Sequence, residues 1–484
     1  MGEIKRNTAS INEDIDIRSL PEKHGITAAE EGDYSGATKK TDPAEIALVR
    51  KLDIRIMPIL WAMYFLNYLD RNALPQARLN TLEEDLNLKG VEYNTAISIL
   101  FVGYLLMQVP SNMFLTKTRP SIYLSICMVG WATVSACTAL VQNYGGLIAT
   151  RFMLGFVEAP YYPGALYILS IFYTRKELAT RIAVLYTGQV VSTACSGLIA
   201  AAVFATLDQV HGIAGWRWLF IIEGAVTFGV ALFGFWLLPD DPSVTRWLTQ
   251  EERDLAVARI QRDTVGMKER GTTLEGLKQA CADPKTWLFC LMQNLHISAV
   301  TFNNFFPTIV RSLGFKSRTT ALLLTAPPYF VSGLLGIPFA WSSGHFNERS
   351  WHITGGLGIA IVGFVMSVVT MNTAVRYTAT FLYATGAYSV GSVILGWVSA
   401  TLSQTPEKKA VAYSLVNVTA NAAYIYCAYL WPKSNEPRYS IGFGSMIGFA
   451  AGSIVCVWVM RFWLMAENRK LRRSDDEHRV TYAY

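Results

Sequence analysis

The stretch RIMPILWAMYFLNYLDRNALP, residues 55–75, decides the fold class of this chain. It is apolar over most of its length, and a helix of that length covers about 30 Å, the thickness of the hydrocarbon core of a bilayer. Asp70 and Arg71 lie close to its end. Because an ionisable group within a bilayer costs roughly 2.5 to 3.5 kcal/mol, we expect a membrane helix whose two charges have partners or a function.

Uncharged or nearly uncharged runs of similar length recur along the whole chain. Hydrophobic residues make up 52% of its 484 residues and charged residues 16%, which is too apolar for a soluble protein of this length. We therefore predict an all-α polytopic membrane protein with twelve transmembrane helices in two six-helix halves. The predicted spans lie at 55–75, 93–115, 121–141, 145–172, 181–206, 216–238, 286–310, 319–342, 351–371, 377–402, 409–431 and 439–463.

A charged stretch separates the sixth predicted span from the seventh. Within it, residues 247–262 have helical spacing and alternating charge, which predicts an amphipathic helix that lies along the inner membrane face and joins the halves. The predicted organisation is a polar, disordered cytoplasmic tail at 1–50, a six-helix half at 51–239, a cytoplasmic linker at 240–285, a second six-helix half at 286–465 and a basic cytoplasmic tail at 466–484.

Basic residues beside the predicted spans indicate the orientation in the membrane. No signal peptide precedes the first span, and Lys and Arg are concentrated in loops on the inner side of the first half, which predicts cytoplasmic N- and C-termini. These residues are Arg50, Lys51, Arg55, Lys117, Arg119, Arg175, Lys176 and Arg181, with Arg469, Lys470, Arg472 and Arg473 in the tail. The net charge of +6 is mostly this topology signal, so we expect no nucleic-acid partner. The seven cysteines lack metal or redox spacing, so we expect no metal site.

The ionisable residues inside the first-half spans predict two ion pairs between helices. Asp70 and Arg71 are about 100° apart around their helix, and Arg151 and Glu158 are about 10 Å apart along theirs, so neither pair can form within one helix. Depth in the membrane then predicts that Asp70 pairs with Arg151 and that Arg71 pairs with Glu158. Carboxylates beside arginines in a low-dielectric cavity are suited to proton exchange, although static bridges between the two helices remain an alternative.

Other polar residues complete the candidate site. Glu223 follows Arg217 by six residues, and we interpret these two as a structural pair. His296 either joins a proton relay or is a packed hydrogen-bond former. The second half supplies uncharged groups suited to orienting a solute that the first half binds by charge. These groups are Asn303, Asn304, Tyr329, Asn417 and Asn421.

Across roughly residues 50–465 these motifs resemble the major facilitator superfamily, and within it the fungal allantoate and vitamin permease branch of the anion:cation symporter family. The motifs are Leu66-Asn67-Tyr68-Leu69-Asp70-Arg71, Pro110-Ser111-Asn112, the segment from Arg151 to Ala159, the segment from Gly215 to Gly224, Phe306-Pro307-Thr308 and Ala326-Pro327-Pro328-Tyr329. The chain departs from the family at Gly344, where an aspartate is usual, and after Trp397, where the common asparagine is missing.

The resemblance implies proton-coupled uptake of a small organic anion by alternating access, with protons as the coupling ion and no other cofactor. It implies proton coupling by Asp70 and Glu158 and substrate binding by Arg71 and Arg151. The stretch from Thr405 to Ala410 resembles the nicotinate-like members, so carboxylates such as nicotinate or allantoate are the expected substrates. We expect a monomer in the lipid bilayer of the plasma membrane.

Three other function classes are alternatives to uptake. A proton-driven exporter of drugs or secondary metabolites usually has a Gly-Pro pair in its fifth span, and residues 188–202 contain no proline. A non-transporting membrane sensor would need long cytoplasmic domains. A membrane enzyme would need clustered ligands or a nucleophile with its base, and the sequence contains neither, so we do not expect an enzyme.

Overall fold

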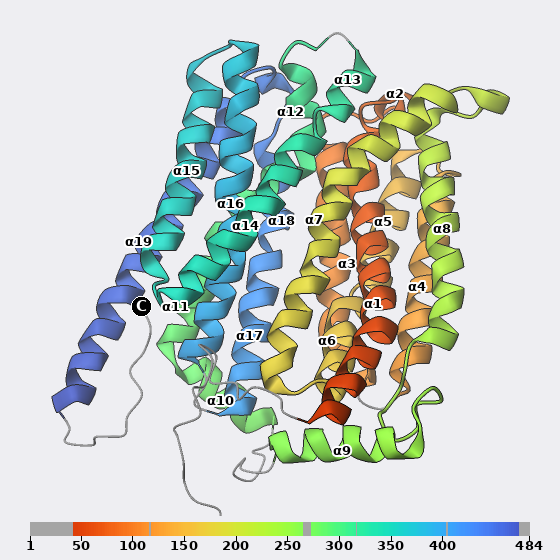
Figure 1. Ribbon diagram of the computed structural model, residues 1–484. Helices are drawn as coiled ribbons and strands as arrows, with labels where there is room; N and C mark the ends of the chain where they lie inside the picture. Colours follow the sequence, from red (N-terminus) through yellow and green to blue (C-terminus); the bar gives the residue numbers. More distant parts are fainter. Residues whose placement is uncertain (1–41, 116–117, 265–272, 316, 403–404, 474–484) are drawn as a thin grey trace, which may run out of the picture. The chain divides into compact units, whose positions relative to one another are not determined.

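The computed structural model describes residues 42–115, 118–264, 273–315, 317–402 and 405–473, and these residues contain helices and no strands (Figure 1). The tail predicted at 1–50 lies outside the described residues up to Thr41, and the basic tail does so from position 474 onward. Pro43 at the start of the first helix and Arg473 at the end of the last one lie at the same end of the helical bundle (Figure 1).

The first half consists of eight α-helices and one short 3-10 helix among the described residues. They are α1 (Pro43–Ala77), α2 (Leu82–Asp85), α3 (Glu92–Leu115), α4 (Pro120–Thr138), α5 (Tyr144–Glu158), α6 (Tyr161–Phe172), α7 (Arg175–Thr206), η1 (Val210–Gly212) and α8 (Gly215–Leu237). The linker contains α9 (Gln250–Thr264) and α10 (Thr273–Ala282). Helix α9 lies close to the range 247–262 expected from the charge pattern.

The second half also consists mainly of long helices, but they are interrupted more often than those of the first half. Its elements are α11 (Pro284–Val300), η2 (Thr301–Phe305), α12 (Phe306–Ser312), α13 (Arg318–Leu323), α14 (Ala326–His345), α15 (Ser350–Val369), α16 (Thr373–Thr401), α17 (Pro406–Asn421), α18 (Ala423–Cys427), η3 (Ala428–Leu430), η4 (Lys433–Asn435) and α19 (Ser440–Arg473).

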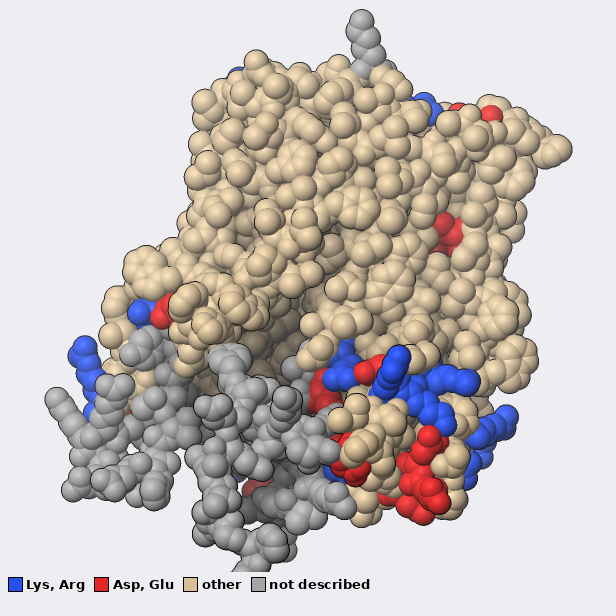
Figure 2. Space-filling view, viewed as in Figure 1, with Lys and Arg blue, Asp and Glu red and all other residues tan. Residues whose placement is uncertain are grey.

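Seven helices in the described parts of the chain are long and apolar enough to cross a membrane without interruption. Three further predicted spans are each divided into shorter helices, namely α5 with α6, α11 with α12, and α17 with α18. When each divided pair is counted once, and α1 and α3 are added, the helices match the twelve predicted spans. Figure 2 shows that the side of the molecule in view has a broad, nearly uncharged band, with Lys, Arg, Asp and Glu gathered near α9.

Proline explains one of these divisions. Pro160 lies between α5 and α6, and a proline has no backbone N–H with which to continue the helical hydrogen bonds. A second proline, Pro307, occupies the first turn of α12, where its missing N–H is tolerated. The breaks change the direction in which the following residues point, and this affects the site.

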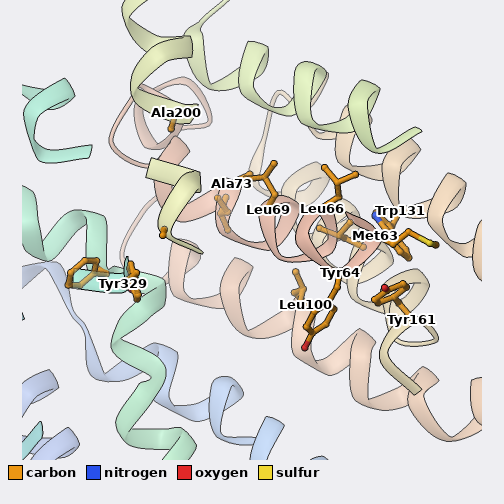
Figure 3. Packing of buried hydrophobic residues seen from close by; sticks show 14 of the residues in the cluster. Met63, Tyr64, Leu66, Leu69, Ala73, Leu100, Trp131, Tyr161, Ala200 and Tyr329 are labelled. Carbon is orange, nitrogen blue, oxygen red and sulfur yellow. The ribbon is translucent and has the colours of Figure 1, made fainter. Parts of the chain in front are cut away.

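Helix α1 lies in the centre of the first half. Its side chains Met63 and Leu66 are fully or almost fully buried, and they lie near Trp131 of α4 and Tyr161 of α6 (Figure 3). The hydroxyl of Tyr161 donates a hydrogen bond to the Leu60 carbonyl oxygen. This packing fixes the helix that contains Asp70 and Arg71.

Helices α3 and α5 approach each other through two glycines. A Cβ atom at Gly155 would overlap the Leu100 carbonyl oxygen, and a Cβ atom at Gly103 would overlap the Phe152 carbonyl oxygen. The two backbones are therefore in direct contact, which only glycine permits. This contact fixes the residues of α5 relative to those of α3.

The two halves are joined at the end of the bundle where α2 lies. The Asn94 amide donates to the Ala428 carbonyl oxygen at 2.5 Å, and Arg311 donates to the Leu79 carbonyl oxygen at 3.2 Å. Lys433 of η4 forms an ion pair with Glu83 of α2 at 3.0 Å. These contacts close the α2 end between the halves.

We expect Lys433→Ala to favour the conformation in which the α2 end is open. The Lys433 side chain is 68% exposed, and exposed ion pairs contribute about 0.2 to 1 kcal/mol, so the population should shift by about two- to fivefold at most. Distances between spin labels at the exposed positions 89 and 434 would measure the shift. Glu83→Gln also removes the ion pair of Glu83 with Arg78 Nε at 2.8 Å, so it should shift the population in the same direction and by at least as much. An unchanged distance in Lys433→Ala would show that the Lys433 pair does not hold this end closed.

Helix α9 is attached to the first half by ion pairs. The Arg259 side chain, only 2% exposed, contacts Glu45 of α1 at 2.9 Å and Glu177 of α7 at 2.6 Å. Lys51 of α1 bonds Glu252 of α9 at 2.7 Å and holds the pKa of that carboxyl below its usual value. Such a docked helix follows the first half when that half moves.

The start of α11 contains a second buried ion pair. Burial acts to raise the pKa of the Asp283 carboxyl, but hydrogen bonds from Lys408 Nζ, at 2.6 Å, and from the Lys285 backbone N–H, at 2.9 Å, lower it below its usual range. Asp283 also caps the N-terminus of α11. The pair therefore ties the start of α11 to α17.

We expect Asp283→Asn to destabilise the protein at pH 7 by about 1.5 to 3 kcal/mol, because the hydrogen bond to a charged partner is lost while the amide still caps the helix. A carboxylate with a lowered pKa stabilises the fold above the unfolded pKa, near 4, and this contribution disappears as the pH falls through the folded pKa. Thermal unfolding of wild type and variant should therefore differ at pH 7, and the difference should begin to shrink as the pH falls below about 4. Asp283→Ala, which also removes the cap, should be less stable than Asp283→Asn at both pH values.

Candidate functional site

A polar cavity of about 80 Å³ lies between the two halves. The first half lines it with charged, aromatic and amide side chains, and the second half lines it with uncharged side chains. The lining residues are Tyr64, Asn67, Tyr68, Arg71, Tyr104, Glu158, Tyr162, Tyr186, Gln189, Gln293, Ile297, Leu395, Asn417, Ala420, Asn421 and Tyr424. Because ligand sites typically enclose roughly 300 to 1,000 Å³, an organic solute fits here only after the halves separate.

Arg71 and Glu158 form the ion pair that was predicted from depth. Arg71 Nε lies 2.6 Å from Glu158 Oε2, and the Glu158 side chain is fully buried. Arg71 donates to Glu158 through its Nε atom, so the Nη1 and Nη2 edge is not used by this carboxylate. The pair joins α1 to α5 and lines the cavity between the halves.

Two tyrosine rings flank the Arg71 guanidinium. Its Cζ atom lies 5.2 Å from the centre of the Tyr68 ring and 4.7 Å from that of Tyr104. Both distances are within the range of cation–π attraction. Arg71 is therefore held by a carboxylate along one edge and by aromatic rings beside it.

The predicted pair between Asp70 and Arg151 is wrong. Asp70 accepts hydrogen bonds from Ser135 at 2.7 Å and Thr227 at 3.2 Å, while the Arg151 guanidinium lies over the Phe220 ring at 5.0 Å. None of the three guanidinium nitrogens of Arg151 has a hydrogen-bond partner within the described structure. Asp70 points about 100° away from Arg71 around α1, toward α4 and α8, where two hydroxyl groups satisfy it.

The predicted structural pair of Arg217 and Glu223 is also wrong. Arg217 donates to the Ala139 carbonyl oxygen and lies over the Trp216 ring at 4.3 Å. Glu223 is buried within α8, and its Oε2 atom has no hydrogen-bond partner among the described residues. Six residues correspond to about 240° around a helix, so the two side chains leave α8 on different faces.

The residues expected from the second half divide into two groups. Asn417 and Asn421 line the cavity, and the Asn421 amide donates to the Asn417 backbone oxygen at 2.9 Å. His296 lies outside the lining, with Nε2 2.8 Å from the Ala387 carbonyl oxygen of α16, as a packed hydrogen-bond former would. Tyr329 is also outside it and is buried against Phe306, with ring centres 4.9 Å apart.

Asn303 and Asn304 likewise lie outside the cavity lining. Both belong to the 3-10 helix η2, which follows the break at the end of α11, and both are half-buried. The prediction treated residues 286–310 as one continuous helix. A change of helix type alters the direction of the side chains that follow it, so a periodicity counted across the break does not apply.

The sequence analysis missed the aromatic and glutamine side chains of the cavity. Six tyrosines line it, and three of them lie close together, because the Tyr64 ring is 5.1 Å from that of Tyr68 and 5.7 Å from that of Tyr162. Tyr68 was detectable in principle, because it precedes Arg71 by three residues and so shares its face of α1. The tyrosines of α3, α6 and α7 gave no such signal.

Comparison with known proteins gives the family of this fold. Residues 60–427 match the model of the Major Facilitator Superfamily. The chain belongs to this superfamily. Major facilitator proteins of known structure share the fold: a bacterial homolog of the human lysosomal transporter Spinster, in an inward-facing and occupied conformation, has a TM-score of 0.66, with 16% identity over 90% of this chain and 99% of that one. A D-xylose-proton symporter has a TM-score of 0.63, with 15% identity over 84% and 97%.

Relatives in the major facilitator superfamily are fungal transporters. The major facilitator-type transporter hxnP of Emericella nidulans is 34% identical over 445 residues, which cover 90% of this chain and 88% of the relative. The MFS-type transporter efuF of Hormonema carpetanum is 33% identical over 433 residues, 88% of this chain and 86% of the relative. This major facilitator protein is accordingly an integral membrane protein and a secondary transporter.

Proposed function

We propose that this protein takes up a small organic anion together with protons, by alternating access, as a member of the anion:cation symporter family in its fungal allantoate and vitamin permease branch. One observation supports this most directly. Arg71 lines the cavity between the halves, with its Nε bonded to the buried Glu158 and its Nη edge not bonded to that carboxylate. A guanidinium edge of this kind suits a carboxylate, which can accept two parallel hydrogen bonds from it.

Glu158 is the proposed link between proton and substrate. When Glu158 is ionised it holds Arg71, and when it takes up a proton from the outer side it releases the guanidinium to bind the substrate carboxylate. Asp70 is the second proposed proton site, since its carboxylate is buried at 0% exposure and accepts bonds from hydroxyl groups only. Neutralising these groups lets the halves rock inward, and the protons then leave on the other side.

The second half contributes groups without charge. Gln293, Asn417 and Asn421 face the same cavity, and amides can orient the part of the substrate that lies away from its carboxylate. Arg151 adds a buried positive charge in the first half, and its guanidinium lies over the Phe220 ring. We propose protons as the coupling ion and no other cofactor.

The proposed orientation places α9 and both ends of the described chain in the cytoplasm. The basic residues that flank the first span, together with the charged side chains gathered near α9 in Figure 2, support it through the excess of Lys and Arg in cytoplasmic loops. The α2 end would then face the outside. We propose the plasma membrane as the location and a single chain as the working unit.

The test is uptake of labelled nicotinate, allantoate, pantothenate and biotin into cells that express the protein, at acidic and neutral external pH, with and without an uncoupler. Accumulation that is stimulated by acid and abolished by the uncoupler would support proton symport and identify the substrate. Protein at the cell surface without accumulation of any of the four would contradict uptake of these anions, and efflux assays would then test the exporter alternative.

A further inference from the structure

The Arg71 guanidinium is flanked by rings from two different helices. Tyr68 belongs to α1, three residues before Arg71, and therefore moves with it. Tyr104 belongs to α3 and has the shorter distance, 4.7 Å from the guanidinium carbon to its ring centre. Of the two rings, only Tyr104 can hold Arg71 in place relative to a second helix.

The position of Tyr104 is itself fixed by backbone contact. Its neighbour Gly103 lies directly against the Phe152 carbonyl oxygen of α5, and Gly155 lies against the Leu100 carbonyl oxygen of α3. Tyr104 is buried at 5% exposure and lines the cavity. The ring therefore belongs to a rigid unit formed by α3 and α5, and this unit also contains Glu158.

We propose that Tyr104 is the positioning residue for Arg71 in anion binding. This inference rests on the proposed function. While Glu158 holds the Nε atom, two contacts orient the guanidinium, namely the carboxylate and the Tyr104 ring. Once Glu158 is protonated the first contact weakens, and the ring keeps the guanidinium beside α3 with its Nη edge toward the cavity.

The proposal assigns the effect to the ring face and not to the hydroxyl. The guanidinium carbon lies within cation–π distance of the Tyr104 ring, and the Tyr104 hydroxyl also interacts with Arg71. Phenylalanine keeps the ring face, and leucine keeps apolar bulk without it. The two substitutions therefore separate the role of the ring from that of the hydroxyl.

The experiment measures KM and the maximal rate of acid-driven uptake for the best substrate of the panel, in Tyr104→Phe and Tyr104→Leu. Tyr104→Phe should keep KM within twofold of wild type. Tyr104→Leu should raise KM by roughly three- to thirtyfold, the loss of affinity that corresponds to one cation–π contact in a partly desolvated site. The KM change should exceed the change in maximal rate per molecule at the cell surface.

A matched control is Tyr383→Leu. Tyr383 is a fully buried tyrosine in an aromatic cluster of the second half, 4.7 Å from Phe302, and it does not line the cavity. Loss of packing there should lower the amount of protein, and hence the total rate, while KM stays at the wild-type value. If Tyr104→Leu does not reach the membrane, Tyr104→Met provides an unbranched side chain without a ring for the same comparison.

The outcomes separate the two proposals. Wild-type KM in Tyr104→Leu or Tyr104→Met overturns the positioning role, and so does a KM in Tyr104→Phe that rises as much as in the leucine variant. Absence of uptake of every anion by the wild-type protein at the cell surface contradicts the proposed function instead.

Discussion

Arg71→Ala should abolish saturable anion uptake, with a fall of at least about a hundredfold in the rate per molecule at the cell surface. Arg71 is the one cation among the described residues that line the cavity between the halves, and its Nη edge is the proposed contact of the substrate carboxylate. Alanine leaves the cavity without a positive charge. Uptake is measured with the labelled substrate over a range of concentrations, and surface protein by labelling of intact cells.

Two further variants sharpen this test. Arg71→Lys keeps the charge but loses the planar fork, so we expect it to retain uptake with a higher KM. Arg50→Ala removes an exposed arginine at the start of α1, outside the cavity, and should behave like wild type. Saturable uptake by Arg71→Ala with an unchanged KM would rule out Arg71 as the substrate-binding residue.

Glu158→Gln should separate net accumulation from exchange. Glutamine has nearly the same shape as glutamate and can accept the hydrogen bond that Arg71 Nε donates, but it cannot take up and release a proton at physiological pH. Accumulation against a gradient should therefore fall to about the level of equilibration. Exchange of internal for external substrate needs no net proton movement and should persist within about twofold of wild type.

The measurement compares acid-driven uptake with counterflow in the same vesicles. Glu348→Gln is a matched control, because Glu348 also forms an ion pair, with Arg461 at 2.5 Å, but does not line the cavity. It should leave both activities intact. Undiminished gradient-driven accumulation in Glu158→Gln would remove Glu158 from the coupling mechanism.

The sequence was sufficient for the spans and for one of the two predicted pairs. Hydrophobic runs gave the helices because burial in lipid requires apolar side chains over a fixed length. Depth along the helix placed Glu158 nearer the midplane than Arg71 but within reach of its long side chain, and the pair is present at 2.6 Å. Rise per residue is constant in a helix, so depth can be counted along a sequence without knowledge of the neighbouring helices.

The neighbouring helix that a side chain faces could not be derived from the sequence in the same way. Asp70 faces α4 and α8, and their Ser135 and Thr227 satisfy it. In the sequence, a serine or threonine whose hydroxyl binds a carboxylate cannot be distinguished from any other serine or threonine. Arg151 consequently lies over Phe220 and not beside Asp70.

The helix breaks account for the misplaced residues of the second half. Beyond Val300 the chain continues as the 3-10 helix η2, so Asn303 and Asn304 do not share the cavity face that an unbroken helix would give them. The aromatic lining was missed for another reason. An ionisable residue stands out within an apolar span, but a tyrosine does not. Tyr104, Tyr162 and Tyr186 contribute ring faces from three other helices.

The glycine contact between α3 and α5 determines which surfaces can slide during transport. Where the carbonyl oxygen of one helix lies against the glycine Cα of the other, no side chains lie between the two backbones that could adopt new rotamers. Any sliding of one helix along the other would therefore bring main-chain atoms into collision. Tyr104 on α3 and Glu158 on α5, the proposed partners of Arg71, therefore move together with their geometry preserved. The change in shape that exposes a substrate to one side or the other takes place elsewhere, and the cavity where the two halves meet is the proposed place for it.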